Sequence, residues 1–204
     1  MLFRSWEQLQ KLADRLSENR VKQIKPFETK VNALLVQVGM PNARIRVQHS
    51  NAELNEFGKD RMEFLFDANQ SQRFEPLSKV ASGGELSRLM LCIKSLVARS
   101  LDLPTLIFDE IDSGISGEAA KQVGVIMKDL SAQRQVICIT HQPQIAGKAN
   151  RHLFVYKEKK GASVQTRVRA LAQEERVNII AQMLGGEKPT AAALQNAREM
   201  VVKA

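Results

Sequence analysis

The segment from residue 81 to residue 141 decides the fold, because it holds the motifs SGGELSR at residues 82–88, TLIFDE at 105–110 and VICITH at 136–141. The last two begin as apolar runs rich in β-branched residues, end in polar residues and are separated by a helix-length segment. This pattern predicts two neighbouring parallel strands of a covered sheet. Ligands bind beyond the carboxyl ends of such strands, so Asp109, Glu110 and His141 are predicted to lie together.

Each of these polar groups has an ordinary explanation when taken alone. An Asp-Glu pair can be a solvated strand end, Ser-Gly-Gly a turn with an N-cap, and a histidine after a strand a surface residue. Their order and spacing favour phosphate chemistry instead. One carboxylate can hold Mg²⁺ while the next polarises a water. The helix expected after Gly84 points its N-terminal amides at an anion.

The three motifs together resemble the C-terminal half of an ABC-type ATPase head. The sequences KVASGGELSR at residues 79–88 and DEIDSGISG at 109–117 resemble those of the RecN family of bacterial double-strand-break repair proteins. These proteins are relatives of the structural-maintenance-of-chromosomes (SMC) ATPases. The resemblance runs from about Val31 to Gly186 and beyond. It implies an α/β fold, with a mainly parallel sheet flanked by helices and an N-terminal coiled-coil stub.

The resemblance also implies the roles of the site residues. Asp109 would hold Mg²⁺ through water, Glu110 would be the catalytic base, and His141 would be the switch histidine that contacts the γ-phosphate. The signature residues would contact the γ-phosphate of ATP bound to a second copy, and the D-loop residues would couple the two sites. The signature set is Ser82, Gly83, Gly84 and Glu85, and the D-loop set is Asp112, Ser113 and Gly114.

The sequence contains no G-x-x-x-x-G-K-[ST] loop, the motif that cradles the α- and β-phosphates. In RecN-like proteins that loop lies in an N-terminal half, so Met1 is interpreted as something other than a natural start. ATP and Mg²⁺ are therefore expected to need the N-terminal half, and this chain alone is expected to be inactive. Further expected partners are a second head and double-stranded DNA or DNA ends, with no membrane.

A second departure from the family pattern is Gln142, a position at which the family commonly has leucine.

Composition agrees with this interpretation. At 204 residues and 44% hydrophobic content the chain can bury a well-packed core, and a net charge of +8 favours polyanionic partners. Cys92 and Cys138 lie in apolar runs and are expected to be core thiols rather than a disulfide or a metal pair. A cytoplasmic, nucleoid-associated location is expected.

The rest of the chain follows the same plan. Apolar residues at helical spacing predict a helix over residues 2–38, with a kink or fresh start near Lys25 because Pro26 follows, and Gly39 ending it. Residues 1–40 are interpreted as the end of a coiled coil and the helix leading into the head, and residues 41–204 as the C-terminal half of the head. An ordinary amphipathic helix remains an alternative before Pro26.

Shorter elements are predicted beyond that helix. Alternating residues predict strands at 44–48 and 62–66 joined by a connection over 55–60, and a hairpin of 152–156 with 163–168. Lysines 157, 159 and 160 are assigned to the tip of this hairpin, as a solubilising turn or a DNA contact. Helices are predicted at 117–130, 174–184 and 191–202, and a short helix or turn at 143–148.

Two other functions stay open. A transporter nucleotide-binding domain shares the fold, although Glu85 and Asp112 argue against it. A DNA-tethering module with a non-hydrolytic nucleotide site is the alternative from another class. The sheet that this chain would share with an N-terminal half predicts an exposed apolar edge.

Overall fold

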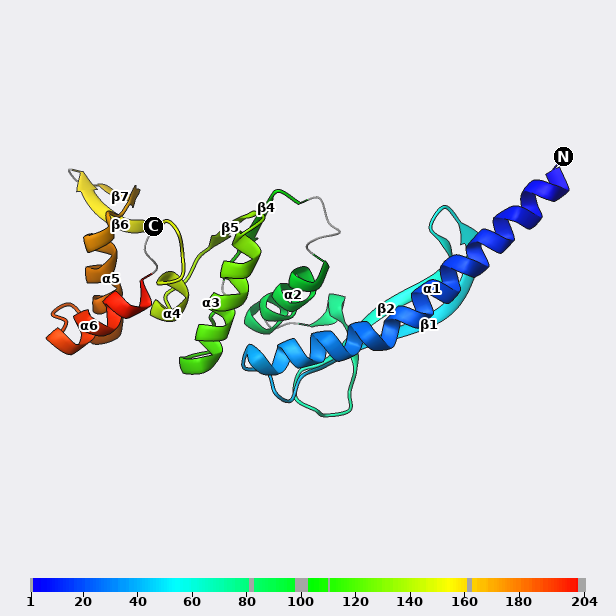
Figure 1. Cartoon of the computed structure of the whole chain (residues 1–204), viewed down its shortest axis with the longest axis horizontal. Coiled ribbons are helices and arrows are strands. Elements are labelled where there is room, and N and C mark those ends of the chain that lie inside the picture. Colours follow the sequence, from blue (N-terminus) through cyan, green and yellow to red (C-terminus); the bar gives the residue numbers. More distant parts are fainter. Residues whose placement is uncertain (1, 81–82, 98–102, 110, 161–162, 202–204) are drawn as a thin grey trace. The chain divides into compact units, whose positions relative to one another are not determined.

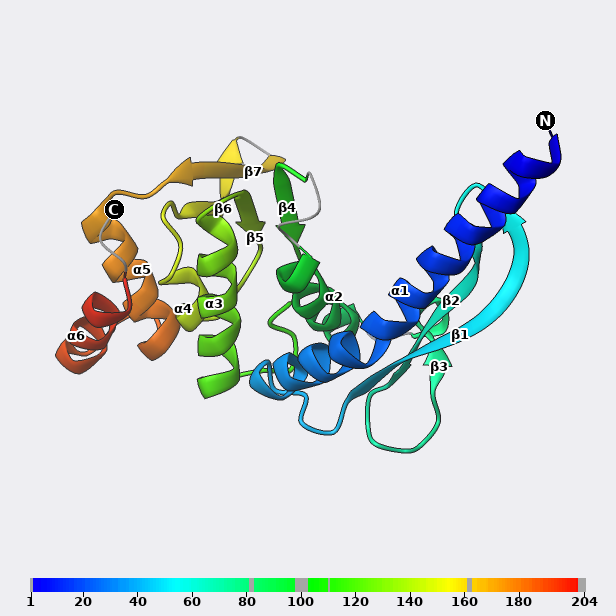
Figure 2. The same cartoon turned by 45° about the vertical axis from the view of Figure 1, so that its right-hand side comes forward.

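The computed structural model of the chain describes residues 2–80, 83–97, 103–109, 111–160 and 163–201. The chain forms two compact units, Met1–Val97 and Ala98–Ala204. Helices and strands are mixed in both units, as Figures 1 and 2 show from two directions. The predicted α/β class is confirmed.

The first unit begins with one long helix, α1 (Leu2–Gln37). It does not restart near Lys25, because it runs unbroken through Pro26. Contacts just after the proline hold the helix: Phe27 packs edge-on against Phe64 at 5.8 Å, and the Glu28 carboxylate accepts a hydrogen bond of 2.8 Å from the Val47 amide. Tertiary contacts thus offset the backbone hydrogen bond that Pro26 cannot donate.

The end of α1 confirms the predicted glycine stop. Gly39 has a φ of 80°, which favours glycine. Its amide donates to the Val36 carbonyl at 3.3 Å, while the Met40 amide donates to the Leu35 carbonyl at 2.9 Å. This is a Schellman motif, which satisfies carbonyls at the helix end.

An antiparallel hairpin of β1 (Arg44–Asn55) and β2 (Gly58–Asp67) lies along α1, as both views show. The short strand β3 (Glu75–Pro76) pairs with β2. The strands are longer than predicted and the connection is only Glu56 and Phe57, so the predicted connection over residues 55–60 is wrong. The alternation of polar and apolar residues that predicted these strands covers only part of each strand. In the remaining part, polar residues on the face toward α1 meet polar side chains of that helix.

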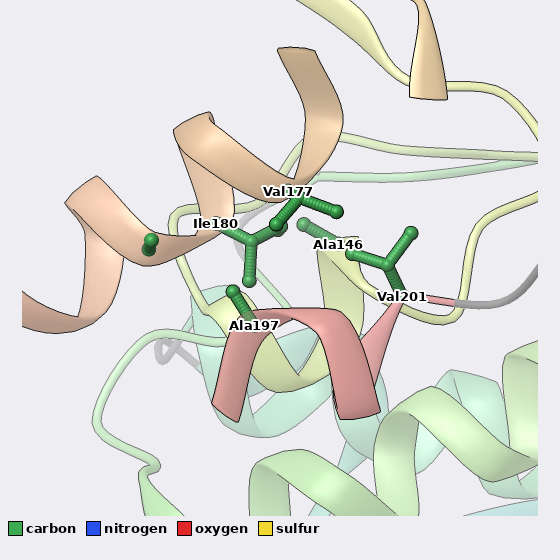
Figure 3. Close-up of a cluster of buried hydrophobic side chains, with 6 residues drawn as sticks. Ala146, Val177, Ile180, Ala197 and Val201 are labelled. Atoms are coloured by element: carbon green, nitrogen blue, oxygen red, sulfur yellow. The ribbon is translucent and has the colours of Figure 1, made fainter. Parts of the chain in front are cut away.

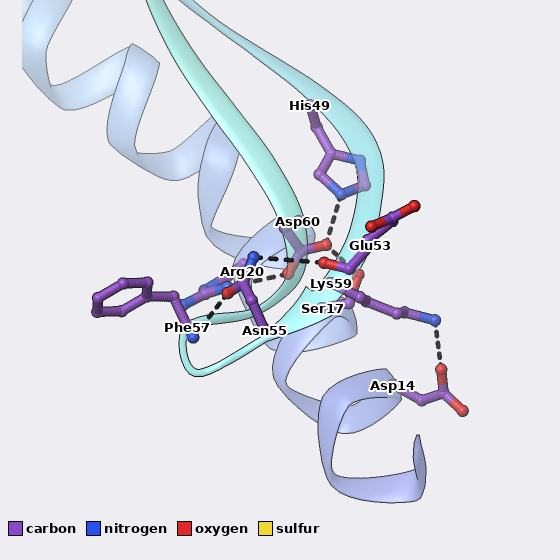
Figure 4. Close-up of polar contacts among 9 residues, drawn as sticks. All are labelled: Asp14, Ser17, Arg20, His49, Glu53, Asn55, Phe57, Lys59 and Asp60. Atoms are coloured by element: carbon purple, nitrogen blue, oxygen red, sulfur yellow. Dashed lines mark hydrogen bonds and ion pairs between the residues drawn. The ribbon is translucent and has the colours of Figure 1, made fainter. Parts of the chain in front are cut away.

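Asp60 is the centre of that polar contact (Figure 4). Its side chain is fully buried and accepts hydrogen bonds from Ser17 at 2.6 Å, His49 at 2.7 Å and Arg20 at 3.1 Å. These bonds, the one from Ser17 first, lower the Asp60 pKa to about 2. The cluster fixes α1 on the hairpin.

The signature segment follows a short 3₁₀ turn, η1 (Leu77–Lys79), and leads into helix α2 (Gly83–Val97). Leu89, Leu91 and Cys92 are buried, and α2 packs against α1. Burial raises the pKa of the Cys92 thiol to about 12 and that of Cys138 to about 12, and both cysteines are free thiols. Cys92 is a core thiol as predicted, whereas Cys138 is only half-buried.

The second unit holds the parallel strand pair β4 (Thr105–Phe108) and β5 (Gln135–Cys138), joined through helix α3 (Gly117–Ser131). Strands β6 (Leu153–Lys160) and β7 (Ser163–Ala170) form an antiparallel hairpin whose strands are longer than predicted. Lys157 and Lys159 therefore lie within β6 and not at a tip. The parallel arrangement holds for β4 and β5, while the other two described sheets are antiparallel.

Three helices complete this unit: α4 (Pro143–Ala146), α5 (Gln173–Gly185) and α6 (Ala191–Met200). They share a small core of buried aliphatic side chains (Figure 3), made of Ala146, Val177, Ile180, Ala181, Ala197 and Val201. Ile180 is fully buried at its centre. Because Ala146 belongs to this core, the core holds α4, the helix that follows His141 in the chain. Among the helices of the described residues, none has the length and apolar character needed to cross a membrane.

Candidate active site

The carboxyl ends of β4 and β5 form one edge, as predicted. Phe108 pairs with Cys138, and the Ile139 amide extends the ladder by donating to the Phe108 carbonyl at 2.9 Å. Asp109 therefore leaves β4 beside the point where residues 139–141 leave β5. The Asp109 side chain is exposed at this edge. Glu110 lies outside the described residues, so its predicted position next to Asp109 stays a prediction.

Asp112 lies three residues beyond Asp109 and is 3% exposed. One carboxylate oxygen, Oδ2, accepts a hydrogen bond from the Thr140 hydroxyl at 2.6 Å and another from the His141 amide at 2.8 Å. The same oxygen lies 3.2 Å from Nδ1 of His141. Two predicted site residues, Asp112 and His141, are thus in direct contact although the sequence separates them by 29 positions.

Gln142 adds a second connection between the same two loops. Its side-chain amide donates to the Ile115 carbonyl at 2.8 Å, and its backbone amide donates to the Thr140 hydroxyl at 3.0 Å. The same side-chain nitrogen lies 3.5 Å from Nε2 of His141. Sequence reasoning noted Gln142 only as a departure from the family and missed Thr140. The signal that could have identified Thr140 is a hydroxyl residue directly before a histidine at a strand end.

The D-loop turns sharply between Asp112 and α3. Gly114 and Gly117 have φ values of 72° and 57°, which other residues rarely adopt. Ser113 and Gly114 are exposed, unlike Asp112. The outer surface of this loop is therefore formed by Ser113 and Gly114.

The signature residues belong to the first unit. Gly83, Gly84 and Glu85 form the first turn of α2, and Gly83 is exposed at the helix end. Helix N-termini carry unpaired amides that suit an anion. Ser82 lies outside the described residues.

The sheet of the second unit leaves one apolar face uncovered. Ile107, Ile137 and Ile139 are 62%, 41% and 59% exposed, whereas Leu106 and Phe108 on the other face are 4% exposed. The exposed residues lie on a face of the strand pair, so the prediction of an exposed apolar edge stays a prediction. Exposed apolar surface of this kind is often a site of interaction.

A metal at this edge would depend on few protein ligands. The described residues hold no cluster of three or more His, Cys, Asp or Glu side chains suited to a metal. Mg²⁺ is commonly bound by one or two carboxylates with water and phosphate oxygens completing its shell, and the exposed Asp109 fits that role.

No protein-family model matches this chain. The DNA repair protein RecN of Vibrio cholerae is 40% identical over 194 residues, which are 94% of this chain and 35% of that protein. RecN of Rickettsia typhi is 40% identical over 96% of this chain and 35% of its own length. RecN of Bacillus subtilis is 41% identical over 152 residues, 74% of this chain and 26% of its own length. The chain thus spans about a third of the length of the first two relatives.

Solved SMC heads share the fold. The Smc head domain of Pyrococcus yayanosii, solved with a coiled coil and joint, has a TM-score of 0.57 at 18% identity, covering 84% of this chain and 32% of that one. The Smc head of Pyrococcus furiosus, bound to the C-terminal domain of ScpA, has a TM-score of 0.52 at 17% identity, covering 81% of this chain and 39% of that one. At these identities the likeness concerns the fold alone.

Proposed function

We propose, from the premise that this chain is a RecN-like segment of an SMC-type ATPase head, that it supplies one side of an ATP site in a DNA-repair ATPase. The observation that carries the proposal is the edge where β4 and β5 end together. Asp109 follows β4, His141 follows β5, and Asp112 holds the histidine loop, which supports a shared site for these residues. Carboxylates and a histidine beyond parallel strand ends suit phosphate chemistry.

In this proposal each polar group at the edge has one role. Asp109 would hold Mg²⁺ through water, and the cation would neutralise charge on the phosphates. Glu110 would orient the attacking water and accept its proton, while His141 would donate a hydrogen bond to the γ-phosphate. A positioned general base contributes about 10²- to 10⁴-fold to a rate.

The signature turn would serve the ATP of a second copy. Ser82 and the amides of Gly83 and Gly84 would cap its γ-phosphate, with Glu85 in the first turn of the same helix. The exposed start of α2 supports this role, because its amides are placed to meet an anion. The active site would then be complete only in a head dimer, and the D-loop residues would lie between its two ATP sites.

The α- and β-phosphates would be held by an N-terminal half that carries the phosphate-binding loop. The uncovered face of Ile107, Ile137 and Ile139 supports such a partner, since it offers apolar surface on which another layer can pack. The exposed Trp6, Leu9 and Leu12 of α1 support the predicted coiled-coil contact near the N-terminus. Double-stranded DNA as the polyanionic partner and a nucleoid location belong to the same proposal, and the net charge of +8 favours them.

The test is ATP turnover by this chain mixed with an N-terminal RecN half, with and without double-stranded DNA. The same mixture carrying Glu110→Gln is the matched control. Turnover that appears only on mixing, rises with DNA and falls at least about 10²-fold in the variant is expected. A folded complex that binds DNA but never turns over ATP would instead favour a tethering module.

A further inference from the structure

The β6–β7 hairpin carries most of the net positive charge of the chain. Residues 151–170 contain six lysines and arginines and a single glutamate, a net charge of +5, while the whole chain has +8. We propose that one face of this hairpin, through Lys157 and Lys159, contacts the phosphate backbone of double-stranded DNA. The choice of DNA as the polyanion rests on the proposed function, whereas the charge and geometry of the face do not.

The arginines of the hairpin already have counter-ions. Successive residues of a strand point to opposite faces, so Arg167 and Arg169 share one face of the hairpin. Nε of Arg167 donates to the Glu158 carboxylate at 3.2 Å, and Nη1 of Arg169 donates to the Glu175 carboxylate at 2.7 Å. Because each arginine forms an ion pair, this face offers little unpaired charge to a ligand.

The two lysines lie on the opposite face, where Lys157 pairs with Thr166 and Lys159 with Val164 across the strands. Both lysines are exposed, and neither makes a hydrogen bond or an ion pair with any residue that the structure describes. Two residues along a strand are about 7 Å apart, so the two charges form a short row. Lysine ammonium groups with unused donors are suitable ligands for phosphate oxygens.

The positions of the aromatic rings favour duplex DNA over a single strand. Phe154 and Tyr156 lie on the arginine face, are half-buried and stack on each other with ring centroids 6.1 Å apart. Among the described residues of the hairpin, the lysine face has no aromatic ring on which a base could stack. Single-strand binders combine charge with such rings, whereas contacts to the duplex backbone need only cations. The lysine face is therefore suited to the duplex backbone, without preference for a base sequence.

A lipid surface is the competing anionic partner, because the same face also holds apolar residues. Leu153, Val155 and Val168 are between 58% and 62% exposed. They occupy the end of the hairpin that leads into α5, whereas the lysines lie at the other end of the strands. A membrane that met the lysine end would find charges first and no apolar side chains to insert, which disfavours this partner.

The test is binding of a fluorescently labelled DNA duplex by the chain alone, followed by anisotropy over a range of salt concentrations. The hairpin variant combines Lys157→Gln and Lys159→Gln. Each lost phosphate contact lowers the slope of log affinity against log salt by about 0.9, so the slope should fall in magnitude by about 2. The affinity at about 0.1 M salt should fall about 10- to 50-fold, and equally for duplexes of different sequence.

The matched control combines Lys121→Gln and Lys188→Gln. It removes the same charge from two exposed lysines elsewhere in the second unit, so it should keep the salt slope of the unsubstituted chain. An equal loss in the control would show that net charge alone matters and would overturn the proposal. An unchanged slope in the hairpin variant, with a thermal melt showing that it is folded, would overturn it as well.

Two further outcomes separate this proposal from its alternatives. If the hairpin variant keeps its affinity for DNA but loses binding to phosphatidylglycerol vesicles, the face belongs to a lipid surface and the proposal is wrong. No ATP is present in these measurements, so they are independent of the ATP site. A chain that never binds the duplex overturns the hairpin contact even if the mixed heads turn over ATP. Binding that depends on the two lysines supports the contact even if the mixed heads never turn over ATP.

Discussion

Replacing Asp60 with asparagine tests how α1 is fixed on the β1–β2 hairpin. The carboxylate is the shared acceptor of Ser17, His49 and Arg20, and these bonds hold its pKa at about 2 instead of 3.8. The substitution would keep the size of the side chain but remove the charge that all three donors favour. The expected result is a less stable first unit at neutral pH.

The magnitude follows from the pKa shift. One pKa unit corresponds to about 1.4 kcal/mol, so a shift from 3.8 to about 2 corresponds to about 2 to 3 kcal/mol. The side chains of Arg20 and His49 are 34% and 24% exposed, and solvent screening reduces the figure, so we expect a loss of about 1 to 2 kcal/mol. Since the folded-state pKa is lowered, this stability is complete above pH 3.8 and is lost as the pH falls through about 2.

The assay is urea unfolding followed by fluorescence of Trp6, the single tryptophan, which lies in the same unit as Asp60. The gap in unfolding free energy between the unsubstituted chain and Asp60→Asn should be full near neutral pH and shrink as the pH approaches about 2. Asp14→Asn is the matched control, because Asp14 pairs with Lys59 in a more exposed ion pair and should cost less than about 1 kcal/mol. A gap below about 0.5 kcal/mol at neutral pH, or one that does not change with pH, would refute the reasoning.

Three further predictions concern packing and assembly. Gly124→Ala should destabilise the second unit by about 1 to 3 kcal/mol, because the new Cβ would lie 2.9 Å from the Gln144 carbonyl oxygen; an unchanged thermal melt would contradict this. Ile107→Lys should reduce self-association in analytical ultracentrifugation while leaving the circular dichroism spectrum unchanged, since Ile107 is 62% exposed on the uncovered sheet face. Ser82→Arg should abolish ATP-dependent dimerisation of the mixed heads, and dimerisation at the normal level in light scattering would exclude the proposed signature contact.

Local patterns predicted the elements of the second unit well. The apolar runs that became β4 and β5 and the helical spacing that became α3 are short-range signals. The parallel pairing of β4 and β5 followed from the helix-length segment between them. Longer strands and an unbroken α1 were not predicted, because contacts between elements outweighed the local signals of Pro26 and of the polar residues in the hairpin.

The sequence by itself predicted the kind of chemistry and determined the local elements, since residue types and spacing are local properties: an acidic pair after one buried strand, a histidine after the next, and a glycine turn before a helix. Only the tertiary structure decided which of these groups touch. Asp112, Thr140 and Gln142 meet because the loops after β4 and β5 lie side by side, and Asp60 is buried because α1 covers the hairpin. Hydrogen bonds between residues far apart in sequence depend on how the strands pair, and no short stretch of sequence records that pairing.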